Sequence, residues 1–253
     1  MKNWWSLVAI SMMALLLRLN NLNSSPHFSD MDWFSNSARM ALATQRLPLL
    51  GITASITWLH QGPLWTYLLL LPTAINLSPL WLTIAGGVAV VVIAYFASGR
   101  LAALALAMLP FAITQAQTAY HTSLIPVFFF IAYLSLVRSK WFLSGLFLGF
   151  LYQLHLLTFI YWPLFIYLLI KKQGKSKQFG FGFILGILPF ILAGPLQLGG
   201  IFIWMVKQLV TGFGGVGSGI STAYWVVLLP LAILLLGGVI KWLHAYRRGF
   251  GSK

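Results

Sequence analysis

Long apolar runs recur along this chain with only short polar connections between them, and this pattern constrains the fold more than any other feature. The runs begin at residue 4 and continue to residue 243. Hydrophobic residues make up 60% of the chain and charged residues only 7%, whereas a soluble domain carries about 25% charged residues. A water-facing shell cannot be built from this composition. We therefore predict an all-α, polytopic transmembrane protein forming a single domain over residues 1–253, with no soluble C-terminal domain.

The apolar runs also predict where the membrane spans lie. The first covers residues 4–19, and we interpret it as a retained membrane helix because no small-residue cleavage site follows it. Further apolar segments lie at 63–76, 79–97, 101–117, 122–137, 141–155, 158–170, 179–197, 200–213 and 223–243. Several are shorter than the ~20 residues that a straight crossing needs. We expect about eight or nine spans, some of them short or broken.

The charge distribution predicts the orientation. The formal net charge is +14, and lysines concentrate in the loop 171–178. Basic loops mark the cytoplasmic side, so this pattern favours a multi-pass protein of the cell membrane over a nucleic-acid-binding protein. If the loop 20–62 is extracytoplasmic, the chain must cross an odd number of times before residue 171. The sequence offers six candidate segments, so one of them does not cross or one boundary is misplaced.

Only two acidic residues occur in the whole chain, and both lie in the tripeptide Asp30-Met31-Asp32. From Met31 onward, apolar residues recur at helical spacing at Phe34, Ala38, Ala41 and Leu42. This spacing predicts a short amphipathic helix on the membrane surface that ends before a proline at position 48.

Two interpretations of the acid pair remain open. Both acids can cap the helix and complement its dipole, which contributes ~0.5–2 kcal/mol. Alternatively, a carboxylate at the boundary of lipid and water acts as a general base on an acceptor hydroxyl. The second interpretation is favoured by the absence of Asp and Glu from every other expected helix start.

Three segments resemble the GT-C superfamily of membrane glycosyltransferases. The first comprises HFSDMDWFSNSARMALATQRLPLLG and the following WLHQGPLWTYLL. The second is TAYHTSLIPVFFF, and the third and weaker one is LYQLHLLT at Leu151 to Thr158. The resemblance spans about residues 1 to 170, and the order and spacing of the segments carry it. The group it resembles most includes dolichyl-phosphate-mannose protein mannosyltransferases and bacterial aminoarabinose transferases of lipid A.

The resemblance implies a function and a catalytic residue. It implies transfer of a hexosyl or pentosyl group from a polyprenyl-phosphate donor to an acceptor on the extracytoplasmic face, with inversion. The register maps the catalytic carboxylate onto Asp30, with Asp32 as the second candidate. The sugar and the acceptor (protein, lipid or glycan) are left open. Membrane lipids are the other expected partners.

Other polar residues are candidates for binding the donor phosphate or the substrate. Arginine suits bidentate contacts with phosphate, so Arg39 and Arg46 are candidates, and Arg18 is a third cation near the end of the first span. The alternative for each is a role without substrate binding, in which the arginine lies at the membrane interface and contacts lipid headgroups.

His60 and Gln61 directly precede the apolar segment 63–76, and helix capping is the alternative role for this pair. Tyr120 and His121 directly precede the segment 122–137. Gln153 and His155 are expected to form hydrogen bonds between helices.

No cofactor is expected. The chain has no cysteine, and two carboxylates at this spacing make a poor divalent-cation site. A zinc site from Asp30, His60 and His121 would need a fold that the sequence does not require. Two alternatives to a transferase remain: a transporter or flippase of a lipid-linked substrate, and a truncated, non-catalytic membrane subunit.

Overall fold

The computed structural model describes residues 4–20, 22, 27, 29–53, 58–194, 197 and 230. Within these residues every regular element is a helix, as predicted, and the one extended pairing is an isolated antiparallel bridge between Thr53 and His60. The expected segments 200–213 and 223–243 lie outside the described residues, apart from position 230. The expectations for the C-terminal part of the chain therefore stay predictions.

The helices follow the predicted apolar segments, with additional breaks. In chain order they are α1 (Trp4–Leu19), α2 (Ser29–Thr44), α3 (Leu64–Ala74), α4 (Leu80–Ser98), α5 (Arg100–Met108), α6 (Pro110–Ala116), η2 (His121–Leu124), α7 (Ile125–Val137), α8 (Trp141–Leu154), η3 (Leu156–Tyr161), α9 (Trp162–Lys171), α10 (Ser176–Gly186) and α11 (Leu188–Ala193).

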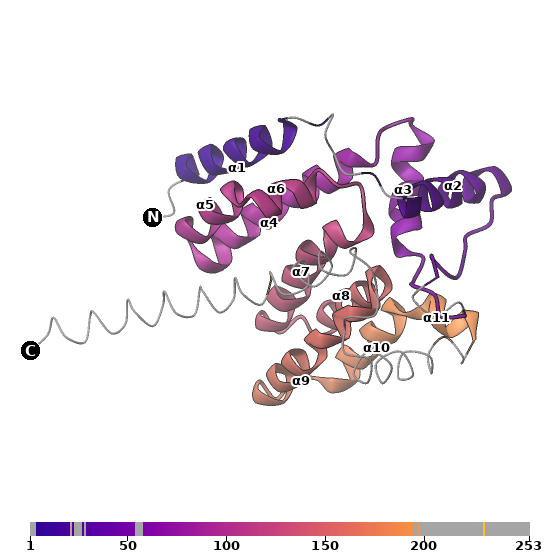
Figure 1. The fold of residues 1–253 in the computed structure, drawn as a ribbon. Coiled ribbons are helices and arrows are strands. Elements are labelled where there is room, and N and C mark those ends of the chain that lie inside the picture. The colour runs from indigo at the N-terminus through magenta and orange to yellow at the C-terminus, as the bar shows by residue number, and fades with distance from the viewer. Residues whose placement is uncertain are drawn as a thin grey trace, which may run out of the picture.

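These helices form two packed groups and one smaller unit (Figure 1). Helices α1, α4, α5 and α6 pack together, and α7, α8, α9 and α10 form the second group, which joins the first where α4 contacts α7. Helices α2 and α3 pack on each other. This unit places the predicted loop 20–62, which contains α2, beside the ends of both groups.

The helical class is confirmed, whereas the expected number of eight or nine spans stays a prediction. Among the described residues α4, with 19 residues, is the single helix long and apolar enough to cross a membrane by itself. A bent pair, Pro110–Ala116 with His121–Val137, passes the same test together with an angle of 118° between its parts. Helices Trp4–Leu19, Leu64–Ala74, Trp141–Leu154 and Leu156–Lys171 are apolar but shorter.

The predicted segment 101–117 is broken at Leu109, and a buried arginine bonds to the carbonyls at the break. Pro110 has no N–H and cannot bond the carbonyl four residues earlier. That carbonyl, Leu106 O, accepts from Arg18 Nη2 at 3.3 Å, and Ala107 O accepts from Arg18 Nη1 at 3.3 Å. The Arg18 side chain is only 1% exposed, so it stabilises the broken helix and does not reach lipid headgroups.

Helices α8 and α10 pack in parallel through facing glycines. Gly145 and Gly149 of α8 lie against α10 so closely that a Cβ at Gly149 would lie 2.7 Å from the Gly186 Cα. A Cβ at Gly182 would overlap the Phe142 carbonyl oxygen. Small residues four apart on both helices let two backbones approach, a packing mode that is frequent between membrane helices.

The helix ends gather at two opposite ends of the molecule. At one end, Gln117 Nε2 of the α6–η2 connection donates to Arg18 O at the end of α1 (3.2 Å), and Thr83 Oγ1 near the start of α4 donates to Ala116 O at the end of α6 (2.8 Å). The end of α8 joins the same set, because His155 stacks on His121. We call this the cavity end.

Both ends of α3 lie at the cavity end. Gly62, just before α3, donates its N–H to Gln153 O near the end of α8 at 3.0 Å. After α3 the chain reaches α4, whose first turns are also at the cavity end, within six residues of Ala74. Six residues span about 20 Å when fully extended, which is less than the ~30 Å of a hydrocarbon core.

Candidate functional site

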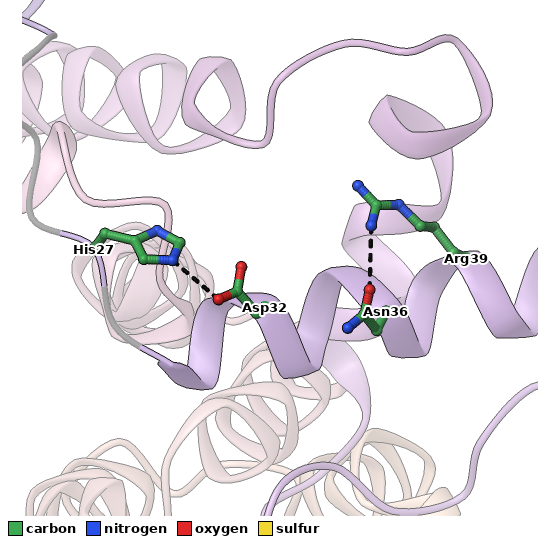
Figure 2. Close-up of polar contacts among 4 residues, drawn as sticks. All are labelled: His27, Asp32, Asn36 and Arg39. Carbon is green, nitrogen blue, oxygen red and sulfur yellow. Dashed lines mark hydrogen bonds and ion pairs between the residues drawn. The ribbon is translucent and has the colours of Figure 1, made fainter.

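The two acidic residues of α2 point in different directions. Successive residues of a helix are turned by about 100°, so side chains two positions apart lie on different faces. Asp30 Oδ2 accepts a hydrogen bond from the Tyr120 hydroxyl at 2.8 Å. Asp32 is 65% exposed and pairs with His27 Nε2 at 3.0 Å, on the outer side of the helix (Figure 2). Asp30 is therefore the acid that contacts the rest of the fold.

The buried face of α2 explains this orientation. Met31, Phe34, Ala38 and Ala41 are buried, as the spacing predicted. Leu42, expected on the same face, is 40% exposed instead, although its neighbour Ala41 is buried. The helix ends at Thr44, four residues before the proline. The Phe34 ring lies 5.2 Å from that of His121, and this contact holds Asp30 beside Tyr120.

An open cavity of about 510 Å³ lies beside Asp30. Its walls come from the start of α2 and from the connection that follows α2. The lining residues are Ser29, Asp30, Trp33, Leu50, Gly51, Ile52, Thr53 and His60. A cavity of this size holds a small organic ligand, and it combines a carboxylate, an imidazole, two hydroxyls and an indole ring.

Backbone pairing shapes the outer wall of this cavity. Gly51 N donates to Gln61 O at 2.8 Å, and Gln61 N donates to Ile52 O at 2.9 Å. The side chain of Gln197 fixes the same wall from far along the chain. Its Nε2 donates to Trp58 O at 2.8 Å, and its Oε1 accepts from His60 N at 3.1 Å.

Behind Asp30 lies a cluster of aromatic rings and imidazoles. The Tyr120 and His121 rings are 4.0 Å apart, and His121 stacks nearly parallel on His155 at 5.7 Å and 11°. His121 is 1% exposed, and neither of its ring nitrogens has a hydrogen-bond partner among the described residues. Buried polar atoms without partners are costly, so this ring has bonding capacity to offer a ligand or a water.

The environment of Tyr120 keeps its hydroxyl protonated. Burial raises the pKa of Tyr120 above its usual value, and the hydrogen bond and negative charge of Asp30 raise this pKa further. The phenol therefore stays a donor to the carboxylate across the physiological range. A neutral donor of this kind fixes the orientation of a carboxylate and leaves its second oxygen available.

The predicted site residues are only partly brought together. Asp30 and His60 line the cavity, and Tyr120 contacts Asp30 directly. His121 lies behind Tyr120 in the 3₁₀ turn η2. Gln61 is buried beside the wall, with no partner for its Oε1 among the described residues.

The predicted phosphate-binding arginines lie elsewhere. Arg39 is exposed and donates to Asn36 at 3.1 Å (Figure 2), and nine residues of helix place it about 13 Å along the axis from Asp30. Arg46 is exposed after the end of α2 and does not line the cavity. Their role in binding phosphate stays a prediction. Across the described ranges, no three His, Asp or Glu side chains converge to hold a metal ion.

Several residues of the site were not predicted. Ser29 and the segment 50–53 line the cavity, yet serine and apolar residues in a loop carry no pattern that would reveal this. Gln197 lies 137 residues from His60 and only the fold brings it there. The predicted bonding role of Gln153 is confirmed, because its amide donates to Gly186 O between α8 and α10. The side chain of His155, which carried the same expectation, instead accepts a local bond from Leu157 N at 3.1 Å.

Comparison with protein family models, with curated proteins and with solved structures gave no match to this chain. Its function is therefore inferred from the cavity and from the packing described above.

Proposed function

We propose that the chain is a membrane glycosyltransferase of GT-C type that moves a sugar from a polyprenyl-phosphate donor to an acceptor hydroxyl, with Asp30 as the general base. The observation that carries this proposal is the 2.8 Å hydrogen bond from Tyr120 to Asp30 at the wall of the cavity. It joins the first two segments that resemble the superfamily. The stacked pair His121 and His155 joins the second to the third.

The chemistry needs one base and one leaving group. The acceptor oxygen attacks the anomeric carbon on the face opposite the phosphate, and Asp30 takes the hydroxyl proton. The bond between that carbon and the phosphate oxygen breaks, and the polyprenyl phosphate leaves with the electron pair. One displacement inverts the anomeric configuration. Trp33 lines the cavity beside Asp30 and offers a flat apolar face to the sugar ring.

A membrane setting is supported by the surface of the helices. Large apolar side chains are exposed along the described helices, among them Leu16 at 60%, Leu71 at 70% and Ile170 at 72%. Exposed apolar surface on this scale marks contact with lipid or with another protein. Since such residues recur on helices all around the fold, lipid is the occupant that accounts for them together.

The arrangement of helix ends supports an extracytoplasmic site. If α3 stays at the cavity end, five crossings separate the loop 20–62 from the loop 171–178. They are α4, the pair α5 and α6, the pair η2 and α7, α8, and the pair η3 and α9. That number is odd, as the opposite placement of the two loops requires. At the end opposite the cavity, Arg100 begins α5 directly after the turn at Gly99, and the connections 138–140 and 172–175 carry further cations. Such a distribution is typical of the cytoplasmic side.

A transfer assay tests the proposal. Wild type, Asp30→Asn and Asp32→Asn are purified in nanodiscs and incubated with radiolabelled polyprenyl-phosphate sugars and membrane extract as the acceptor. We expect transfer by wild type and Asp32→Asn, and a loss of at least a hundredfold in Asp30→Asn with the fold intact. Loss only in Asp32→Asn would move the base to that residue. No transfer from any donor by wild type would refute the enzyme and leave the non-catalytic subunit.

A transporter or flippase of a lipid-linked substrate is the second candidate. It is favoured by the interrupted helices at Leu109 and at residues 117–120, because transporters commonly bind substrate at broken helices. Movement of a labelled lipid between leaflets of proteoliposomes, unaffected by Asp30→Asn, would support this candidate over the transferase.

A further inference from the structure

Six exposed cations gather at the end of the second helix group opposite the cavity. They lie on two connections, 138–140 between α7 and α8 and 172–175 between α9 and α10, and on the helix residues that flank the second connection. The residues of this basic surface are Arg138, Lys140, Lys171, Lys172, Lys175 and Lys177.

Packing makes the two connections one surface. Lys172 Nζ donates to Val137 O at 2.7 Å and so ties the end of α9 to the end of α7. At Gly174 a Cβ would lie 2.8 Å from the Trp141 ring, so the second connection lies directly against the first turn of α8. The charges of both connections therefore face the same partner.

No acidic side chain of the protein lies near this surface to balance its charge. The two acidic residues of the chain, Asp30 and Asp32, both lie on α2 at the cavity end. Six like charges at close range repel one another, and salt screens this repulsion only beyond a distance of about 8 Å. A partner that presents several negative charges in one plane would relieve the repulsion.

Apolar side chains next to the cations identify the kind of partner. Ile170 is 72% exposed and Tyr167 is 57% exposed on the last turns of α9, and Val137 is 39% exposed at the end of α7. A nucleic acid or acidic protein would leave these apolar groups in water. An anionic layer with an apolar layer directly beside it matches both kinds of side chain.

We propose that the basic surface binds the phosphate headgroups of anionic phospholipids in the leaflet at this end of the bundle. Juxtamembrane lysines and arginines each contribute roughly a fivefold gain in affinity for such a leaflet. Lys172 also bonds Val137 O, and the Lys171 ammonium lies over the Tyr167 ring at 5.7 Å from its centroid. The remaining four side chains, Arg138, Lys140, Lys175 and Lys177, are therefore the ones that extend to the headgroups. This inference needs the chain to be in a membrane but does not depend on glycosyl transfer.

Lipid retention by the full chain tests this. Wild type is extracted from nanodiscs made of equal amounts of phosphatidylglycerol and phosphatidylcholine with identical acyl chains, and the lipids that remain bound are counted by native mass spectrometry. We expect at least a tenfold preference for phosphatidylglycerol. The double variant Lys175→Gln, Lys177→Gln should lower this preference by roughly twenty-fivefold, a factor of about five for each charge removed. Both side chains are exposed, so their removal leaves the core unchanged.

The matched control is Lys175→Arg, Lys177→Arg, which keeps both positive charges at the same exposed positions and should leave the preference unchanged. Equal loss in both double variants would show that the charge of these side chains does not carry the preference and would overturn the proposal. It would also be overturned by equal retention of the two lipids in wild type. Competition by millimolar glycerol phosphate would assign the surface to a free phosphate ligand instead. A transfer assay on Lys175→Gln, Lys177→Gln separates this inference from the proposed enzyme, whose activity should persist.

Discussion

The Tyr120 hydroxyl donates to Asp30 Oδ2 at 2.8 Å across ninety residues of sequence. This contact distinguishes Asp30 from Asp32, which pairs with His27 at the surface. It also ties α2 to the turn before η2, so that a residue of the first loop depends for its orientation on a residue between two later helices.

Replacing Tyr120 with Phe should lower the transfer rate by roughly ten- to a hundredfold. A hydrogen bond to a charged group contributes about 1.5–3 kcal/mol, and without it the Asp30 carboxylate loses its fixed orientation. The comparison is Tyr95→Phe, which loses a hydroxyl bond of 2.7 Å to Ser6 far from the cavity. Transfer rates and melting temperatures are measured for both variants. Equal rates in the two would argue against a positioning role for Tyr120.

Single cysteines should show that α3 does not cross the membrane. The chain has no cysteine, so Asn36→Cys, Ser78→Cys and Ser139→Cys each carry one thiol at an exposed position. An impermeant maleimide added to intact cells should label Asn36→Cys and Ser78→Cys, whereas Ser139→Cys should react only after permeabilisation. Labelling of Ser78→Cys on the side opposite to Asn36→Cys would mean that α3 is a crossing.

Arg18 should stabilise the break between α5 and α6. Arg18→Met leaves the Leu106 and Ala107 carbonyls without their donor, and a buried polar group left without a partner costs about 1–3 kcal/mol. Pro110→Ala restores an N–H for Leu106 O, so the double variant should be more stable than Arg18→Met alone. Unfolding in detergent measures all three. A double variant whose loss equals the sum of the single losses would contradict this explanation.

The glycine contact between α8 and α10 should be sensitive to a single methyl group. Gly182→Ala places a Cβ against the Phe142 carbonyl oxygen, and overpacking of this kind costs about 1–3 kcal/mol. Gly180 lies on the same helix with open space at its Cβ position, so Gly180→Ala should be neutral or slightly stabilising. Thermal unfolding of the two variants in the same detergent gives the comparison, and an equal loss would exclude the close packing.

Much of the helical framework followed from the sequence, because apolar runs of helical length are a local property. The spacing of Met31, Phe34, Ala38 and Ala41 predicted the buried face of α2 correctly. The break at Leu109 was missed, although Pro110 marks it, because the apolar run continues through it. The sequence required an odd number of crossings between the two loops but offered six segments. Which segment stays on one side cannot be predicted locally, since it depends on contacts such as that between Gly62 and Gln153; the proposed number of crossings stays a prediction.

The sequence by itself determined that the chain is helical and apolar, that its two acids lie together at the start of an amphipathic helix, and that its lysines cluster in one loop. These are properties of residues close together in the sequence, so they can be predicted without knowledge of the fold. Only the tertiary structure decided that Asp30 faces Tyr120, that Gln197 fixes the wall bearing His60, and that Arg18 is buried at a helix break. Such contacts join residues roughly ninety to 140 positions apart, and no local pattern records which helices pack together.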